Sequence, residues 1–235
     1  MNQLITLALT DFKLIFRDPS LRIFLVFPLF IFAIILLGLP ALIDSFKAVE
    51  SFVPIVLMGA TIQTSTMFGF IYCMVFIHEK DLEVAKVYGV LPVSKIGYVI
   101  SRLVIPFVVS TIMTFLLLVV QPFFSFGFLS MVLLSILCGL FSPVFALLVS
   151  VLSKNKMEGM TWFKLVNLLT TIPLAAFFVV KYDFLFGIVP TYWAFQALDG
   201  MIENKDILLP LVIGFSFVIV LLVLLISRFT KVHFE

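Results

Sequence analysis

Charged residues are scarce in this chain. Only 12% of its 235 residues are Asp, Glu, Lys or Arg, whereas 63% are hydrophobic, and the mean hydropathy is +1.28. A soluble domain carries about 25% charged and about 45–50% apolar residues. Because one soluble core cannot bury this excess, the composition predicts an integral membrane protein. A net charge of +2 gives no reason to expect a nucleic-acid partner.

Residues that commonly carry chemistry are also rare. Histidine and cysteine occur twice each, and Cys73 and Cys138 lie inside apolar runs, where cysteine is typically a small core residue. The chain contains no phosphate-binding G-x-x-x-x-G-K-[ST] loop, no H-E-x-x-H, no C-x-x-C and no nucleophile elbow. We therefore expect no catalytic residue, no cofactor site and no metal site, and we predict that the chain is not an enzyme.

The long apolar runs contain no aspartate or glutamate. Ion-coupled transporters use buried carboxylates and basic residues as proton or sodium relays. Intramembrane proteolysis would need paired aspartates, or serine with histidine or lysine, at mid-span. If this protein moves a substrate, its energy is therefore expected to come from elsewhere.

Six apolar stretches approach the roughly 20 residues that a membrane-spanning helix needs. They are residues 23–43, 52–77, 103–120, 129–151, 163–180 and 207–226. Prolines in or beside these stretches do not exclude them, because neighbouring helices and hydroxyl groups can satisfy the freed backbone groups. The expected fold is an all-α polytopic membrane protein with six transmembrane helices in one domain, residues 1–235.

Lysine and arginine are distributed unevenly around these stretches. Of the 15 such residues, only Lys47, Lys181 and Lys205 fall on the side opposite the N-terminus. The other twelve are Lys13, Arg17, Arg22, Lys80, Lys86, Lys95, Arg102, Lys154, Lys156, Lys164, Arg228 and Lys231. Because short cytoplasmic loops are enriched in Lys and Arg, this asymmetry predicts a multi-pass protein of the cytoplasmic (inner) membrane with both termini in the cytoplasm.

Two segments are not expected to span. In residues 2–18 the polar set advances in steps of three and four, which predicts an amphipathic helix in the cytoplasmic interface over residues 1–20. Residues 182–206, on the outer side, are too short to cross as one apolar run and are interrupted by Gly187 and Pro190. We expect a pair of short re-entrant or surface helices there.

The connection after the second stretch is unusually charged, with five charges in the eight residues from Glu79 to Lys86. It reads Glu79-Lys80-Asp81, then Pro92-Val93-Ser94, then Tyr98 and Arg102. Three further short patterns occur elsewhere in the chain: "DFKLIFRDP" at 11–19, "NKMEG" at 155–159 and "PTYW" at 190–193. In their order along the chain, these patterns resemble the permease subunits of ABC-2 type exporters, especially small drug-export permeases such as those for fluoroquinolones.

The resemblance implies that residues 78–95 form a cytoplasmic coupling helix, seated in a groove of a separate ATPase subunit that binds ATP and Mg²⁺. The residues that it implies for this coupling are Glu79, Lys80, Asp81, Glu83, Lys86, Pro92 and Ser94, together with Arg17 of the interface helix. The alternative is a solvated loop whose charges only keep it out of the lipid.

The second stretch also contains more polar residues than a lipid-facing helix needs. Gly59, Gln63, Thr66 and Cys73 fall near one helix face, and the fifth stretch contains Asn167 and Thr170 before Pro173. Small and hydroxyl residues often serve close helix packing. In the resembling exporters these two spans face a central cavity, so Gln63, Thr66, Asn167 and Thr170 are candidate residues of a substrate path.

Together these features predict a permease half that forms a homodimer or pairs with a second permease among the membrane lipids. Driven by its ATPase partner, it would export a hydrophobic or amphipathic small molecule or a lipid. One alternative is a membrane scaffold or assembly factor without transport, whose charged connection docks another soluble protein. A second is a membrane-embedded lipid-modifying enzyme, which would need clustered polar and charged residues at one bilayer face.

Overall fold

The computed structural model describes residues 15–16, 19–81 and 95–234. The predicted interface helix, residues 1–20, lies almost wholly outside these residues. Of the predicted coupling helix, residues 78–95, only the two ends are described. Residues 78–81 are the last turn of one long helix, and Lys95 is the first residue of the next.

The described residues form helices and no strands, and six segments are long and apolar enough to cross a membrane. These segments are Leu21–Ser45, Lys47–Asp81, Lys95–Val120, Phe128–Leu152, Lys156–Phe177 and Leu208–Val232. Each overlaps one of the six stretches expected from hydropathy. The prediction of an all-α polytopic membrane protein with six transmembrane helices is therefore confirmed.

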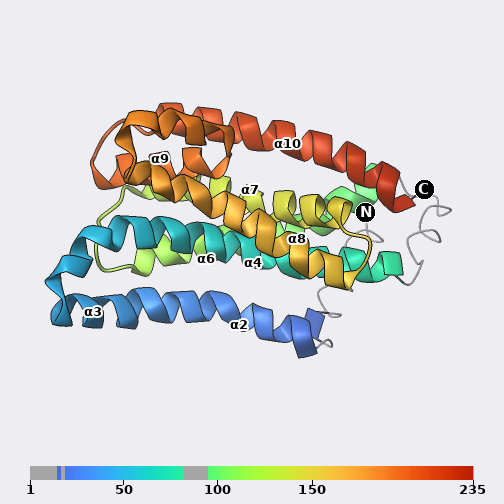
Figure 1. Ribbon diagram of the computed structural model, residues 1–235, viewed down its shortest axis with the longest axis horizontal. Helices are drawn as coiled ribbons and strands as arrows, with labels where there is room; N and C mark the ends of the chain where they lie inside the picture. Colours follow the sequence, from blue (N-terminus) through green and yellow to red (C-terminus); the bar gives the residue numbers. More distant parts are fainter. Residues whose placement is uncertain (1–14, 17–18, 82–94, 235) are drawn as a thin grey trace.

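Figure 1 labels the helices within these segments. They are α2 (Pro19–Ala33), α3 (Leu39–Ser45), α4 (Val53–Asp81), α6 (Lys95–Val120), α7 (Phe128–Leu152), α8 (Lys156–Thr171), α9 (Thr191–Ile202) and α10 (Leu208–Phe234). A π-helix at Ile34–Gly38 joins α2 to α3, and a 3₁₀-helix at Lys47–Phe52 leads into α4. Two further 3₁₀-helices, Ile172–Phe177 and Val180–Ile188, lie between α8 and α9.

The boundaries of α6 and α8 differ from those expected. Helix α6 begins eight residues earlier than residue 103, because Tyr98 and Arg102 are buried in the bundle and their turns continue the helix. Helix α8 gives way to a 3₁₀-helix at Ile172, next to Pro173. Proline cannot donate a backbone hydrogen bond, so it disrupts a regular α-helix at this point.

Helices α4 and α7 form the centre of the bundle. The most apolar windows of their segments are 89% and 72% buried, whereas the corresponding windows of the other four are 17–33% buried. Gly69 of α4 allows the two axes to approach closely, since a Cβ there would lie 2.6 Å from the carbonyl oxygen of Ser142. Small residues at helix crossings are a common device in membranes, where packing replaces the hydrophobic effect between helices.

The two ends of the bundle differ in charge. One end, called the basic end below, is where α4 ends, α6 begins, α7 ends, α8 begins and α10 ends (Figure 1). The opposite end contains α3, the connection 121–127 and α9. In the described part of the chain, Lys47, Lys181 and Lys205 belong to the opposite end. The fold therefore gathers the remaining described Lys and Arg residues toward the basic end.

Helix α9 and the 3₁₀-helix before it occupy the region expected to hold short outer helices. Thr191, Phe195 and Leu198 of α9 are buried, and α9 packs against α10 and α7. The indole N–H of Trp193 donates to the carbonyl of Gly187 at 3.0 Å, which ties the two short helices together. Their depth in a membrane stays a prediction.

Candidate functional site

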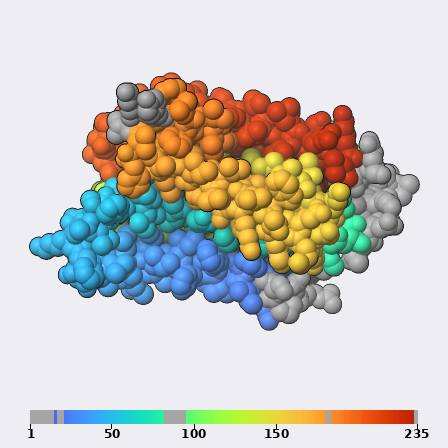
Figure 2. Space-filling view, in the orientation of Figure 1, coloured from blue at the N-terminus to red at the C-terminus, as the bar shows by residue number. Residues whose placement is uncertain are grey.

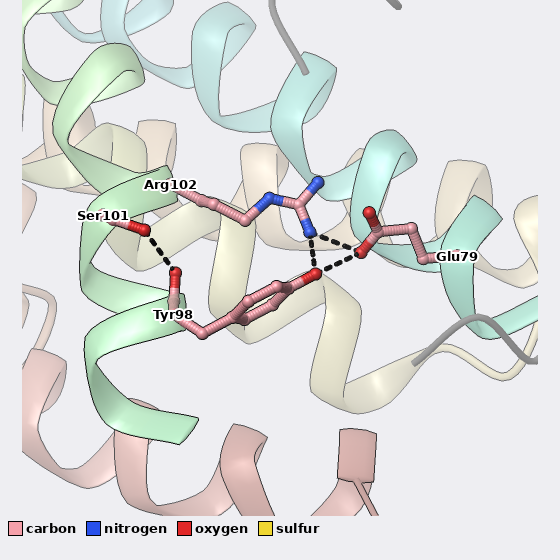
Figure 3. Close-up of polar contacts among 4 residues, drawn as sticks. All are labelled: Glu79, Tyr98, Ser101 and Arg102. Carbon is pink, nitrogen blue, oxygen red and sulfur yellow. Dashed lines mark hydrogen bonds and ion pairs between the residues drawn. The ribbon is translucent and has the colours of Figure 1, made fainter. Parts of the chain in front are cut away.

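A buried ion pair joins α4 and α6 at the basic end. Tyr98 and Arg102 are four residues apart and therefore lie on one face of α6. Arg102 is fully buried, and its Nη1 donates to Oε2 of Glu79 at 2.5 Å. The Tyr98 hydroxyl donates to the same carboxylate oxygen at 3.0 Å and accepts a hydrogen bond from Arg102 (Figure 3).

Aromatic rings surround the guanidinium of Arg102. Its Cζ lies 4.9 Å from the ring centroid of Phe76 and 5.1 Å from that of Tyr98, which favours cation–π attraction. Phe76 also packs against Phe229 of α10, with ring centroids 5.1 Å apart. We call Phe76, Glu79, Tyr98 and Arg102 the Arg102 cluster. Through it, α4, α6 and α10 are joined at one level of the bundle.

The structure gives the predicted coupling residues different environments. Glu79 is only 8% exposed, and its carboxylate bonds to Tyr98 and Arg102 of α6, so its role in coupling stays a prediction. Lys80 is half-buried, and its Nζ donates to the carbonyl of Ser153 at the end of α7 at 3.1 Å. Asp81 is exposed. The rest of the predicted coupling set, Arg17, Glu83, Lys86, Pro92 and Ser94, lies outside the described residues.

The sequence contains a signal for this cluster in the spacing of Tyr98 and Arg102. A basic residue and a tyrosine spaced four apart inside an apolar run must find a partner when buried. Three acids, Glu79, Asp81 and Glu83, follow the preceding apolar run, and Glu79 is the one closest to the end of that run.

The "NKMEG" pattern forms the turn between α7 and α8. Asn155 is the N-cap of α8, with its Oδ1 accepting from the backbone N–H of Glu158 at 3.0 Å. The Glu158 carboxylate accepts from the backbone N–H of Lys154 at 2.9 Å, an arrangement closely related to a capping box. A Cβ on Gly159 would lie 2.6 Å from Cδ1 of Ile77. The pattern therefore places the start of α8 directly against α4 at Ile77, which lies between Phe76 and Glu79 of the Arg102 cluster.

The candidate path residues form one connected set. The side-chain amides of Gln63 and Asn167 exchange two hydrogen bonds, each 3.2 Å long, between α4 and α8. Thr66 donates to Oε1 of Gln63 at 3.2 Å, and Thr170 donates to the carbonyl of Asn167 at 2.8 Å. Because an unsatisfied amide is costly in hydrocarbon, this reciprocal pairing gives both amides the partner they need.

The same set reaches the opposite end of the bundle. Thr191, the first residue of α9, donates to the carbonyl of Thr170 at 2.7 Å. This contact lies close to Pro173, where α8 loses its regular hydrogen bonding. The "PTYW" pattern thus supplies the hydroxyl that fastens α9 to α8, a contact that the sequence did not suggest.

Lys164 lies on the outside of α8 rather than in a loop. It is eight residues from the start of the helix, which corresponds to about 12 Å along its axis at 1.5 Å per residue. The neighbouring Phe163 points inward, with its ring centroid 4.3 Å from that of Phe70 on α4. Lys164 is exposed and forms no ion pair within the described residues.

The bundle, its buried ion pair and its intramembrane amide pair describe a multi-pass helical membrane protein with polar contacts between its central spans. The family model of the fluoroquinolones export permease protein Rv2686c-like matches residues 11–226. The chain belongs to this family of export permeases, which confirms the resemblance drawn from its short patterns. No curated protein matches the chain.

Proposed function

We propose that this protein is the membrane-spanning half of an ATP-driven exporter, which works as a dimer with a separate ATPase subunit. The match to an export permease family over residues 11–226 is the observation that carries the proposal. The sequence contains no phosphate-binding loop and no acid in its apolar stretches. An external energy source therefore suits it better than an ion gradient relayed through its own carboxylates.

In this proposal the basic end faces the cytoplasm. The enrichment of Lys and Arg there agrees with the charge bias of cytoplasmic loops. The connection 82–94 leaves α4 and enters α6 at this end, so a cytoplasmic ATPase would meet it there. Asp81, exposed at the end of α4, is the described acid that is best placed for such a contact.

The exposed surface of α8 is an argument for a second protomer. Its segment is the least apolar of the six, yet only 22% of the most apolar part of this segment is buried. Figure 2 shows α8 lying across one face of the molecule, with α2 below it and part of α4 between them. A lysine such as Lys164 is costly against lipid tails. Another protomer or a water-filled cavity along α8 would remove that cost.

The substrate path would run along the seam between α4 and α8. After their reciprocal bonds, the amides of Gln63 and Asn167 each retain a second N–H for a ligand. Phe70, on the same face of α4 as Gln63, contacts Phe24 of α2 and Phe163 of α8, with centroids 4.7 and 4.3 Å apart. Amide donors two helical turns from a group of aromatic rings suit an amphipathic aromatic molecule, in agreement with the fluoroquinolones of the family's name.

Accumulation in cells tests this function. Cells are loaded with a fluoroquinolone, whose own fluorescence reports its internal concentration, and express the chain together with a candidate ATPase subunit. We expect lower accumulation only when both proteins are present. A hydrolysis-deficient ATPase is the matched control. Equal export with the inactive ATPase would contradict ATP-driven transport.

A further inference from the structure

We infer that Glu79, Tyr98 and Arg102 are positioning residues that clamp the end of α4 to the start of α6, so that the connection between these helices moves both together. The inference rests on the proposed function, because it concerns how movement of an ATPase reaches the spans. It gives Glu79 an internal task in place of the partner contact expected from the sequence.

The first argument is the energy of a buried ion pair. Removing Glu79 and Arg102 from water carries a desolvation cost that their attraction does not always offset. Apolar residues of similar volume often give equal or greater stability. Stability alone therefore does not account for a fully buried arginine at this position. Compared with apolar packing, the pair fixes the relative orientation of the two helices, since a guanidinium and a carboxylate bond well in few orientations.

The second argument is location. Glu79 is two residues before the end of α4, and Tyr98 and Arg102 lie in the first two turns of α6. The covalent link between the two helices is residues 82–94. The ion pair thus joins the two helices at the points where this connection begins and ends. Force applied to the connection is therefore shared by both helices and does not bend the end of α4 alone.

The third argument is the support behind Glu79. Lys80 bonds to the end of α7, and Ile77 packs under Gly159 of α8. Phe76 packs on Phe229 of α10. The last turns of α4 are therefore held by three other helices, and the ion pair adds α6 to this set. Movement at the clamp would reach most of the bundle and, through α4 and α8, the seam that contains Gln63 and Asn167.

A double-mutant cycle separates positioning from packing. The variants are Glu79→Leu, Arg102→Met and the combined Glu79→Leu/Arg102→Met, purified and reconstituted with the ATPase partner. Each single change should lower the melting temperature, because it removes the opposite charge that the structure places against the remaining buried one. The double variant should regain most of that loss. Its fluoroquinolone transported per ATP hydrolysed should nevertheless fall about 2- to 30-fold, the range for residues in a coupling network.

Two further variants serve as controls. Arg228→Met removes an exposed arginine at the same end of the bundle and should change neither the melting temperature nor the transport per ATP. Arg102→Lys keeps the charge but loses the planar donor group, so its transport per ATP should lie between those of wild type and Arg102→Met.

Two results would contradict the inferred clamp, and a third would contradict the proposed function instead. A double variant with wild-type transport per ATP would make the pair a packing feature only. Loss of ATPase co-purification in Glu79→Leu but not in Arg102→Met would make Glu79 a direct partner contact. If the wild-type protein itself shows no ATP-dependent transport, the proposed function fails, and that result is visible before any variant is compared.

Discussion

The guanidinium of Arg102 and the carboxylate of Glu79 lie 2.5 Å apart inside the helix bundle, at the point where α4 and α6 approach the connection between them. An acid that looks like a surface contact in the sequence is therefore an internal partner. Reversing its charge would place two cations together in a buried site. A loss of function in Glu79→Lys would consequently report damage to the fold rather than to a docking surface.

Asp81 is the better probe of docking, because it is exposed two residues beyond Glu79. We predict that Asp81→Lys leaves the melting temperature unchanged but weakens co-purification of the ATPase, and that the difference from wild type shrinks as salt rises and screens the charges. Asp44→Lys changes an exposed acid of α3 at the opposite end and is the matched control. If wild type and Asp81→Lys co-purify with equal amounts of the ATPase at low salt, Asp81 does not contribute to the contact.

The predicted topology rests on the uneven distribution of lysine and arginine. In a background with Cys73 and Cys138 replaced by alanine, single cysteines are introduced at Ala48, Ser125, Glu203 and Met157, all of which are exposed. An impermeant thiol reagent added to intact cells should label the first three positions and not Met157. Labelling of Met157 from outside would overturn the orientation with the basic end in the cytoplasm.

The crossing of α4 and α7 depends on Gly69. We predict that Gly69→Ala lowers stability by about 1–3 kcal/mol, the usual cost of overpacking, because the new Cβ would meet the Ser142 backbone oxygen and the Phe145 Cβ. Gly38→Ala is the matched control, since a Cβ there meets nothing within 4 Å. Thermal unfolding in detergent compares the two. If both variants melt alike, the close approach of the axes is not what limits stability.

The amide pair of Gln63 and Asn167 distinguishes a substrate path from packing. Interhelical hydrogen bonds in a membrane average about 0.6 kcal/mol in one well-studied case, so Gln63→Leu and Asn167→Leu should still be expressed, dimerise and support basal ATP hydrolysis. If both amides line the path, each variant should change which compounds are exported. Ser216→Ala, an exposed hydroxyl change on α10, should not. A double variant that is less stable but exports the same compounds would contradict the path role of these residues. It would not contradict the proposal that the protein is an exporter.

Hydropathy was sufficient to locate the spans, because a helix that crosses lipid must be apolar over most of its length. It was insufficient where a span ends in buried polar residues. The first turns of α6 look like a loop in the sequence because they carry Lys95, Ser101 and Arg102. Their burial in the bundle depends on the bonds of Tyr98 and Arg102 to Glu79 of α4. The need of Gln63 and Asn167 for partners could be predicted from their chemistry. That they bond to each other could not, because the relative rotation of α4 and α8 is set by packing around residues such as Gly159.

Transport by the purified complex tests the central claim most directly. The chain and its ATPase partner are reconstituted in proteoliposomes, with the nucleotide sites outside, and entry of a fluoroquinolone into the vesicles is followed by its fluorescence. The account predicts uptake that requires ATP, both proteins and hydrolysis, and that persists when ion gradients are collapsed. Uptake by the chain alone, or uptake that follows an imposed proton gradient without ATP, would contradict it.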